Sequence, residues 1–396
     1  MRVLRDIFKK SFLLSVVAST VVYATNGDEL IGVGAKTRAM GGAGIALDHG
    51  AESTLVNPAL ITKVKSTDIT LGGTVFMPTI KTDLGPSGKL SESKNNLNII
   101  PLALIANKIS KNLYFGIGMY GTAGMGVDFR TKDNLMNMED TLQLLQFAIP
   151  VAYKRGPLSV GVSLILQYGS LDINYKNNMS KNPQTVGYGQ KQDYKVGANI
   201  GLTYDFDNGF SVGAVYKSKI KMSYAKVISL ATKMFGLNIG DALAQPAELG
   251  FGVAYTNGAH RVALDYKIIK WGSAQGYKDF GWKDQDVIAL GYEYKTGKYI
   301  LRAGYNYASN PLIIRDGFTQ KGAIYNAFNL LGFPATSKHH FTVGVGYRFN
   351  KFLYGDLALV YSPKSKTSAS LKGIGINSIK NEHSELSLTA QVSYKF

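Results

Sequence analysis

The sequence contains no cysteine and little proline, and both absences narrow what the chain can be. A chain of 396 residues without cysteine has no disulfide framework, thiol nucleophile or cysteine-ligated metal. Proline, which cannot donate to a sheet ladder, accounts for 11 residues, whereas glycine (44), tyrosine (24) and phenylalanine (18) are plentiful. This composition suits strands that carry aromatic side chains at a boundary between water and lipid.

Long hydrophobic runs are also missing. No segment after residue 24 approaches the roughly 18–20 apolar residues that a membrane helix requires. Residues 1–24 have a basic start, a short apolar core at Ser11–Thr20 and a small-residue cleavage site at Val22-Tyr23-Ala24. They are therefore predicted to be a signal peptide, since the apolar run is too short for an uncleaved anchor.

Acidic residues are scarce, with 27 against 44 basic ones and a net charge of +17. Residues 1–24 carry four cations and one anion, so their removal leaves +14. Anionic lipid, including lipopolysaccharide, or a carboxylate-bearing substrate fits this charge, although scattered solvated lysines also explain much of it. We expect no nucleic-acid partner, because the chain has no basic helix or known binding module.

From Thr67 onward the sequence alternates at a period of two, as strands do. Long polar segments alternate with short turns such as Asp207-Asn208-Gly209, a strong hairpin signal. Six short turns and seven long loops separate fourteen strands. The short turns are Lys108–Asn112, Arg155–Pro157, Asp207–Gly209, Thr256–His260, Thr296–Lys298 and Asn350–Lys351; the long loops are 81–95, 128–145, 176–191, 226–246, 272–282, 308–337 and 364–383.

One face of these strands is apolar and the other is small or polar. Leu249, Phe251, Val253 and Tyr255, for example, alternate with glycine, alanine and threonine. A soluble barrel would turn the apolar face inward, but the strand number and the aromatic residues at strand ends argue against it. Residues 67–396 are therefore predicted to form an all-β fold, a 14-stranded antiparallel transmembrane β-barrel.

The segment before the strands, Asn26–Thr62, contains seven glycines and many alanines. It is too irregular for a strand, and its glycines let it fold tightly on itself. A compact segment before a closed sheet suggests a hatch inside the lumen, which we assign to residues 25–66. The triplet Asn57-Pro58-Ala59 resembles the hatch of the FadL/TodX (OMPP1) family of outer-membrane channels for hydrophobic molecules.

The resemblance continues over residues 25–396 in the family's order. Further matches are Pro246–Gly250, Phe280–Asp284, Leu301–Tyr305, His339–Thr342 and Gly344–Tyr347. The last strand, Leu386–Phe396, resembles the C-terminal assembly signal of outer-membrane proteins. The barrel-assembly machinery is therefore an expected partner through Phe396, and we expect a monomer.

The resemblance implies an outer-membrane location and passive uptake of long-chain fatty acids or similar hydrophobic molecules. In the family a lumenal lysine before a strand holds the ligand headgroup, and Lys283 matches it. Alternation also places Arg302 inside, although an ion pair with Glu293 or Asp265 explains it equally well. A channel for aromatic or alkane hydrocarbons, or a surface adhesin or structural porin, remain alternatives.

Two long loops contain apolar segments that read as helices, Asn137–Phe147 and Tyr224–Leu237. Such loops suit a protein that captures a lipid from outside, though they could also pack only on each other. The candidate contacts are Met138, Leu142, Leu145, Ile228, Met234 and Phe235.

The third strand, Leu113–Phe129, is rich in glycine, and the neighbouring strands contain Pro101 and Pro150. Glycine and proline both weaken a sheet ladder. The family releases solutes sideways at a kink in this strand, so a lateral gate is predicted around Tyr120–Gly126. Making room for the hatch is the alternative. The gate residues are Gly121, Thr122, Gly124 and Gly126.

Catalytic patterns are missing. The five histidines are scattered, and no nucleophile is spaced with an orienting base. Gly32-Val33-Gly34 begins like a dinucleotide fingerprint, but the third glycine and the preceding strand are lacking. We therefore expect no enzymatic activity, no cofactor and no metal.

Overall fold

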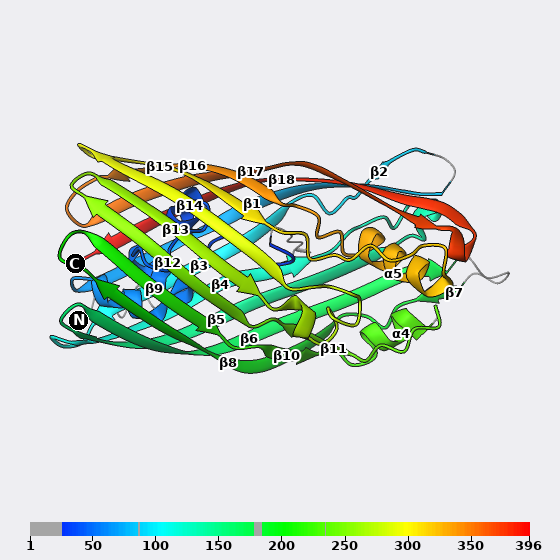
Figure 1. Ribbon diagram of the computed structural model, residues 1–396, viewed down its shortest axis with the longest axis horizontal. Coiled ribbons are helices and arrows are strands. Elements are labelled where there is room, and N and C mark those ends of the chain that lie inside the picture. The colour runs from blue at the N-terminus through cyan, green and yellow to red at the C-terminus, as the bar shows by residue number, and fades with distance from the viewer. Residues whose placement is uncertain (1–25, 86–87, 178–183, 234) are drawn as a thin grey trace, which may run out of the picture.

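The computed structural model describes residues 26–85, 88–177, 184–233 and 235–396 of the chain (Figure 1). The predicted signal peptide lies outside these residues. Fourteen antiparallel strands form the barrel, each paired with its neighbours in sequence. They are β1 (Thr67–Leu84), β3 (Asn98–Lys108), β4 (Leu113–Met125), β5 (Glu139–Arg155), β6 (Leu158–Asn177), β8 (Lys191–Asp205), β9 (Phe210–Lys217), β12 (Glu248–Asn257), β13 (His260–Ile269), β14 (Gln285–Thr296), β15 (Tyr299–Ala308), β16 (His339–Arg348), β17 (Leu353–Leu371) and β18 (Ile376–Lys395).

The last strand closes the barrel against the first. β18 pairs with β1 from Asp68↔Lys395 to Leu84↔Ile379. The terminal residue takes part, because the Phe396 N–H donates to Thr67 O at 3.0 Å and the Thr67 N–H donates back at 2.8 Å. Closure leaves no strand edge exposed to lipid, which a membrane barrel requires.

The outer surface of the barrel is apolar, as the alternation predicts. Phe251, Val253, Phe341 and Val343 are each 46–54 % exposed, while the residues between them face inward. A continuous apolar surface is favourable in contact with lipid hydrocarbon and unfavourable in contact with water. The predicted 14-stranded transmembrane barrel is therefore confirmed. None of the helices in the described part of the chain is long and apolar enough to cross a bilayer.

Short turns gather at one end of the barrel and long loops at the other (Figure 1). The long-loop end carries two helices, α4 (Val227–Lys233) and α5 (Gln320–Leu331), and four short strands. These strands are β2 (Ser91–Glu92), β7 (Gln184–Val186), β10 (Ile220–Ser223) and β11 (Ala242–Gln245). In outer-membrane barrels short turns face the periplasm, so α4 and α5 lie on the outer side.

Two loop predictions are wrong. The predicted helix at Asn137–Phe147 is strand from Glu139 onward, because β5 pairs with both β4 and β6 there. The predicted loop at 364–383 is mostly strand, since β17 and β18 stay paired as far as Leu371↔Ile376. The helix expected within Tyr224–Leu237 is present as α4.

The hatch lies inside the periplasmic half of the barrel as a run of short helices (Figure 1). They are α2 (Ala35–Ala39), α3 (Ser53–Val56) and two 3₁₀ turns, Gly50–Glu52 and Pro58–Lys63. Asn57 caps the last turn by accepting from Ala59 N at 3.1 Å, and its amide donates to Ile45 O at 2.7 Å. A Cβ at Gly201 of the wall would lie 1.9 Å from Asn57 Oδ1, so only glycine permits this approach.

Hydrogen bonds fix the hatch to the inner wall. The Asp265 carboxylate accepts from Gly44 N at 2.7 Å and Ile45 N at 2.9 Å. On the opposite side Gln391 accepts from Ala35 N and donates to Glu52, both at 2.8 Å. The hatch is thus held in one position, which determines where the cavities lie.

Candidate functional site

A first cavity, the outer cavity, lies under the loops on the outer side of the barrel. Its walls come from α5, the segment after α4 and the β17–β18 hairpin. Its lining is entirely apolar and includes Met136, Met138, Phe235, Ile324 and Phe328. The unfilled space is about 20 Å³, so a solute must displace these side chains to enter. Flexible methionines make such displacement inexpensive.

A second cavity, the inner cavity, lies deeper in the lumen. It is lined by Met125, Leu171, Ile173, Ile228, Leu243, Tyr277, Phe280, Trp282, Asn329 and Phe333. No charged side chain is among these described lining residues. Aromatic rings connect the two cavities: Phe235 lies 5.4 Å from Tyr175 and 5.0 Å from Phe328, and Phe328 lies 6.0 Å from Phe280 of the inner cavity, measured between ring centroids. A solute passing inward therefore has to part this aromatic cluster.

The floor of the inner cavity is a second aromatic cluster against the start of the hatch. The rings of Trp271, Tyr277 and Trp282 lie 4.6–5.1 Å apart. Gly27 packs so close to Trp271 that a Cβ there would lie 2.6 Å from the indole. The Tyr277 hydroxyl donates to the fully buried Asp28 carboxyl, whose pKa is raised to about 7 by burial.

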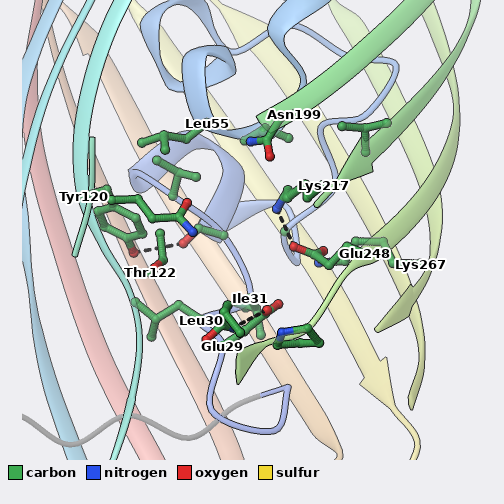
Figure 2. Close-up of a pocket in the computed structure, with 18 of the residues that line it drawn as sticks. Glu29, Leu30, Ile31, Leu55, Tyr120, Thr122, Asn199, Lys217, Glu248 and Lys267 are labelled. Carbon is green, nitrogen blue, oxygen red and sulfur yellow. Dashed lines mark hydrogen bonds and ion pairs between the residues drawn. The ribbon is translucent and has the colours of Figure 1, made fainter. Parts of the chain in front are cut away.

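The hatch-side cavity lies on the other side of this segment and holds about 80 Å³ (Figure 2). Lys217, Glu248 and Lys267 form one wall, facing Tyr120 and Thr122 across the cavity. Glu248 accepts from Lys217 at 2.6 Å and lies 3.6 Å from the Lys267 ammonium. Both lysines are thus already paired with a carboxylate.

Glu29 also lines the hatch-side cavity, below this ion pair in Figure 2. Its carboxyl accepts from Gln245 Nε2 at 2.6 Å. Burial, assisted by the nearby Glu248 charge, raises the Glu29 pKa to about 8. The Glu29 carboxyl is therefore harder to ionise than that of an exposed glutamate.

The barrel wall is interrupted beside this cavity. The β3–β4 ladder ends at Leu102↔Tyr120, and the β4–β5 ladder shifts register between Gly121 and Ala123. The hatch supplies the missing partner: Leu30 N donates to Thr122 O at 3.1 Å, and Gly124 N donates to Asp28 O at 2.9 Å. Residues Asp28–Leu30 thus form a latch, named here for its pairing with β4 at the interruption.

The predicted capture residues are distributed over these cavities. Met138 and Phe235 line the outer cavity and Ile228 the inner one. Leu142 is buried without lining either, Leu145 is half-buried on β5, and Met234 lies outside the described residues. The predicted gate residues Gly121, Thr122 and Gly124 lie at the wall interruption, and Gly126 follows the end of β4.

The two predicted cations are not at the cavities. Lys283 is exposed in the loop before β14 and lines none of the three cavities described above, so its predicted contact with a ligand headgroup stays a prediction. Arg302 does face inward but lies beneath the hatch, where its guanidinium bonds Glu293 at 2.8 Å and Asp356 at 2.7 Å. The contacts of Arg302 therefore agree with the ion-pair interpretation.

Comparison with known proteins agrees with this geometry. Residues 15–396 match the family model described as outer membrane protein transport protein (OMPP1/FadL/TodX). The chain belongs to this family. FadL/TodX proteins are outer-membrane channels for hydrophobic compounds and not enzymes, and these properties hold for the chain.

Solved structures of the FadL/TodX family share the fold at low identity. The P. putida toluene transporter TodX is 20 % identical, with a TM-score of 0.72 and coverage of 93 % of this chain and 99 % of that one. A Pseudomonas aeruginosa FadL homologue is 14 % identical, with a TM-score of 0.73 and coverage of 96 % and 100 %. The Ralstonia pickettii toluene transporter TbuX is 19 % identical, with a TM-score of 0.67 and coverage of 93 % and 99 %.

A short match to a Chlorobium limicola protein adds little. That uncharacterised protein, from the 5' region of a phosphoenolpyruvate carboxykinase gene, is 47 % identical over 49 residues. The match covers 12 % of this chain and spans about a quarter (24 %) of the relative's length. It carries no functional argument.

Sequence reasoning missed the floor of the inner cavity. Tyr277 lies in the predicted loop 272–282, Trp271 lies just before it, and Trp282 belongs to the family match Phe280–Asp284, but the sequence analysis assigns none of the three to a site. A signal was available, since the only two tryptophans of the chain lie within twelve residues there. Asp28 and Glu29 gave no signal of their own, because two carboxylates at the start of a hatch normally lie in water.

Proposed function

We propose that this FadL/TodX protein takes up small neutral hydrophobic molecules, with aromatic compounds as the preferred class. The observation that carries this proposal is the inner cavity, which is lined by apolar and aromatic side chains. Aromatic walls favour aromatic solutes through offset and edge-to-face contacts. A carboxylate in this cavity would lose its hydration without gaining a cation, which is costly.

Fatty-acid uptake is the second candidate. Lys217 and Lys267 favour it, because they face the hatch-side cavity and share the single carboxylate of Glu248. A fatty-acid headgroup would have to cross the apolar inner cavity before it reached these lysines, so we place this candidate second.

The route we infer runs from the outer cavity through the inner cavity to the latch and out sideways between β3 and β4. Two features support a lateral exit: the β3–β4 ladder ends at Tyr120, and the latch covers the unpaired part of β4. Straight passage to the periplasm would require the whole hatch to move. Displacing the latch breaks only a few hydrogen bonds, each contributing about 1 kcal/mol.

Binding of matched neutral and acidic ligands tests the substrate class. Trp282 lines the inner cavity and Trp271 packs against it, so intrinsic tryptophan fluorescence reports on this site alone. We expect p-xylene to bind at least about 10-fold more tightly than p-toluate at a pH where the acid is ionised, because burial of an unpaired carboxylate costs more than 1.4 kcal/mol.

The same titration with hexadecane and palmitate extends the test to long chains. Tighter binding of palmitate, lost in Lys217→Met, would overturn the proposal in favour of fatty-acid uptake. Failure of every ligand, together with ion conductance in planar bilayers, would point to a porin instead.

A further inference from the structure

A group of polar side chains lies between the inner cavity and the hatch-side cavity. Asn26 and Asp28 come from the start of the hatch, and Gln245 comes from the end of β11; together they are called the polar cluster here. Tyr277, which lines the inner cavity, donates to Asp28. Gln245 lines the hatch-side cavity. A solute passing from one cavity to the other therefore meets Asp28 and Gln245, and Asn26 lies two residues before Asp28 in the chain.

The polar cluster is buried but incompletely hydrogen-bonded. Asn26 and Asp28 are 0 % exposed and Gln245 is 5 % exposed. Within the part of the chain that the structure describes, Asp28 Oδ1, Gln245 Oε1 and both amide atoms of Asn26 have no hydrogen-bond partner. Buried polar atoms are nearly always paired, and leaving one unpaired costs about 1–3 kcal/mol. Four such atoms at one place call for a ligand-based explanation.

The orientation of the cluster is fixed by its other contacts. The Tyr277 hydroxyl holds one oxygen of Asp28, so the second oxygen remains available as an acceptor. Gln245 donates its amide to Glu29 Oε1 at 2.6 Å, which leaves its own oxygen as an acceptor too. The backbone of Asn26 is held by a 2.9 Å bond from its N–H to Glu29 O. Free acceptors therefore outnumber the single free donor, the Asn26 amide.

We propose that the polar cluster recognises a hydroxyl group on an otherwise apolar solute, so that the channel prefers phenols and similar alcohols to plain hydrocarbons. This inference rests on the proposed function and specifies its substrate class. The apolar body of the solute occupies the inner cavity. Its hydroxyl donates to Asp28 Oδ1 or Gln245 Oε1 and accepts from the Asn26 amide, which satisfies both kinds of free atom.

Other polar ends fit the cluster less well. A carboxylate offers only acceptors and would face Asp28 and Glu29, two carboxyl groups already raised in pKa by burial. An ammonium group would have to cross the apolar inner cavity with its full desolvation cost. A hydrocarbon leaves the free atoms unpaired. Sites that hydrogen-bond a hydroxyl discriminate strongly against analogues that lack it.

Three ligands of similar size and shape test the proposal by tryptophan fluorescence: p-cresol, p-xylene and 4-methylanisole, whose ether oxygen can accept but not donate. In Asp28→Asn the tyrosine hydroxyl is expected to hold the amide oxygen, so that an NH₂ group replaces the free acceptor. At about pH 8, above the Asp28 pKa of about 7, we expect p-cresol affinity to fall roughly 10-fold or more, as for a hydrogen bond to a charged group. Affinity for p-xylene and 4-methylanisole should stay within about twofold.

Asp48→Asn is the matched control, because Asp48 belongs to the same hatch but pairs with Arg261 at 2.9 Å on the periplasmic side. It should leave all three affinities unchanged. Gln245→Met is a second variant, with an expected p-cresol loss of about 3-fold, and it carries the test alone if Asp28→Asn fails the heat-shift assay for a folded barrel.

The outcomes separate the two proposals. If p-xylene binds to the wild type but p-cresol binding is unchanged in both variants, hydroxyl recognition is wrong while the proposed function stands. An equal loss for all three ligands would also overturn it, because the cluster would then be only structural. If no neutral ligand binds to the wild type, the proposed function itself fails.

Discussion

At the scale of single residues, Arg302 shows that a cation pointing into the lumen can stabilise the fold without binding a ligand. Its side chain is 3 % exposed, and the two carboxylates that it joins, on Glu293 and Asp356, are each 2 % exposed. The Glu293 carboxylate also forms an ion pair with the Arg261 guanidinium at 3.0 Å. Removing the guanidinium would leave two buried carboxylates with fewer partners, a costly arrangement.

We therefore predict that Arg302→Met lowers the free energy of unfolding by about 3–5 kcal/mol, the cost of breaking a buried ion pair by removing one partner. Thermal unfolding followed by heat-shift electrophoresis measures this. The affinities for p-xylene and palmitate should not change. Arg348→Met is the control, because Arg348 is exposed and its guanidinium donates to the Gly297 carbonyl at 3.4 Å. A selective loss of palmitate binding in Arg302→Met would return Arg302 to the ligand site.

The two-residue alternation of a strand predicts the direction of the Arg302 side chain but not that of Lys283. Arg302 lies within β15, where a period of two fixes which face each residue takes. Lys283 lies two residues before β14 begins, and there the loop decides its direction. Of the carboxylates that hold Arg302, Glu293 was one of the two partners predicted, whereas Asp356 lies on β17, whose register with β16 is not readable from a single segment.

At the scale of elements, β5 explains why one helix prediction failed. Met138, Leu142 and Leu145 have helical spacing, but Asp140, Leu142 and Leu144 also alternate toward the inside. The ladders to β4 and β6 decide between the two patterns, and they join residues far apart in the sequence. Pairing with β6 along the whole length of β5 thus overrides a local helical preference.

The interruption in β4, by contrast, was visible in the sequence. The glycines and Pro150 predicted a defective ladder, and the β4–β5 pairing skips Gly116 and Ile117 opposite Pro150 and Ile149 as well as shifting at Gly121. What the sequence could not indicate is that the start of the hatch fills the gap. That contact joins residues about 90 positions apart through backbone atoms, which carry no sequence signal.

The latch makes a prediction of its own. Glu29 and Ala123 form an antiparallel bridge, so cysteines at these two positions lie at a separation that a disulfide can span. The chain has no cysteine, so the double variant Glu29→Cys/Ala123→Cys can form only this bond within the chain. We expect oxidation to reduce p-xylene uptake by cells at least about 10-fold and reductant to restore it, because the latch then stays on β4.

The matched control is Val75→Cys/Leu388→Cys, which joins two wall strands that are already paired. Oxidation of this pair should not affect uptake. If uptake continues at the wild-type rate with the Glu29–Ala123 bond closed, the solute leaves by another path and the lateral route is wrong.

At the scale of the whole molecule, the barrel and the hatch have different interiors. The outer half of the lumen is filled by apolar and aromatic side chains, whereas the wall around the hatch is polar. Ser387 accepts from Arg38 at 2.6 Å, Thr342 accepts from Gly41 N at 3.0 Å, and Asn306 donates to Gly41 O at 3.0 Å. Water could replace the hatch as the hydrogen-bond partner of these polar side chains. We therefore expect the wall to fold without the hatch.

A variant that lacks residues 26–64 but keeps residues 1–25 tests this division. The fourteen strands keep all their pairings, including the closing β18–β1 ladder, so we expect a folded barrel that still shows the heat shift. Water would then fill the periplasmic half of the lumen, and the latch and the hatch residues that support the floor of the inner cavity would be gone. We expect steady ion conductance in planar bilayers, whereas the complete protein should conduct little.

Discrimination between p-xylene and p-toluate should disappear, because the inner cavity loses Gly27 and Asp28 beneath Trp271 and Tyr277. A variant that folds but remains closed to ions would show that the outer loops and not the hatch seal the channel.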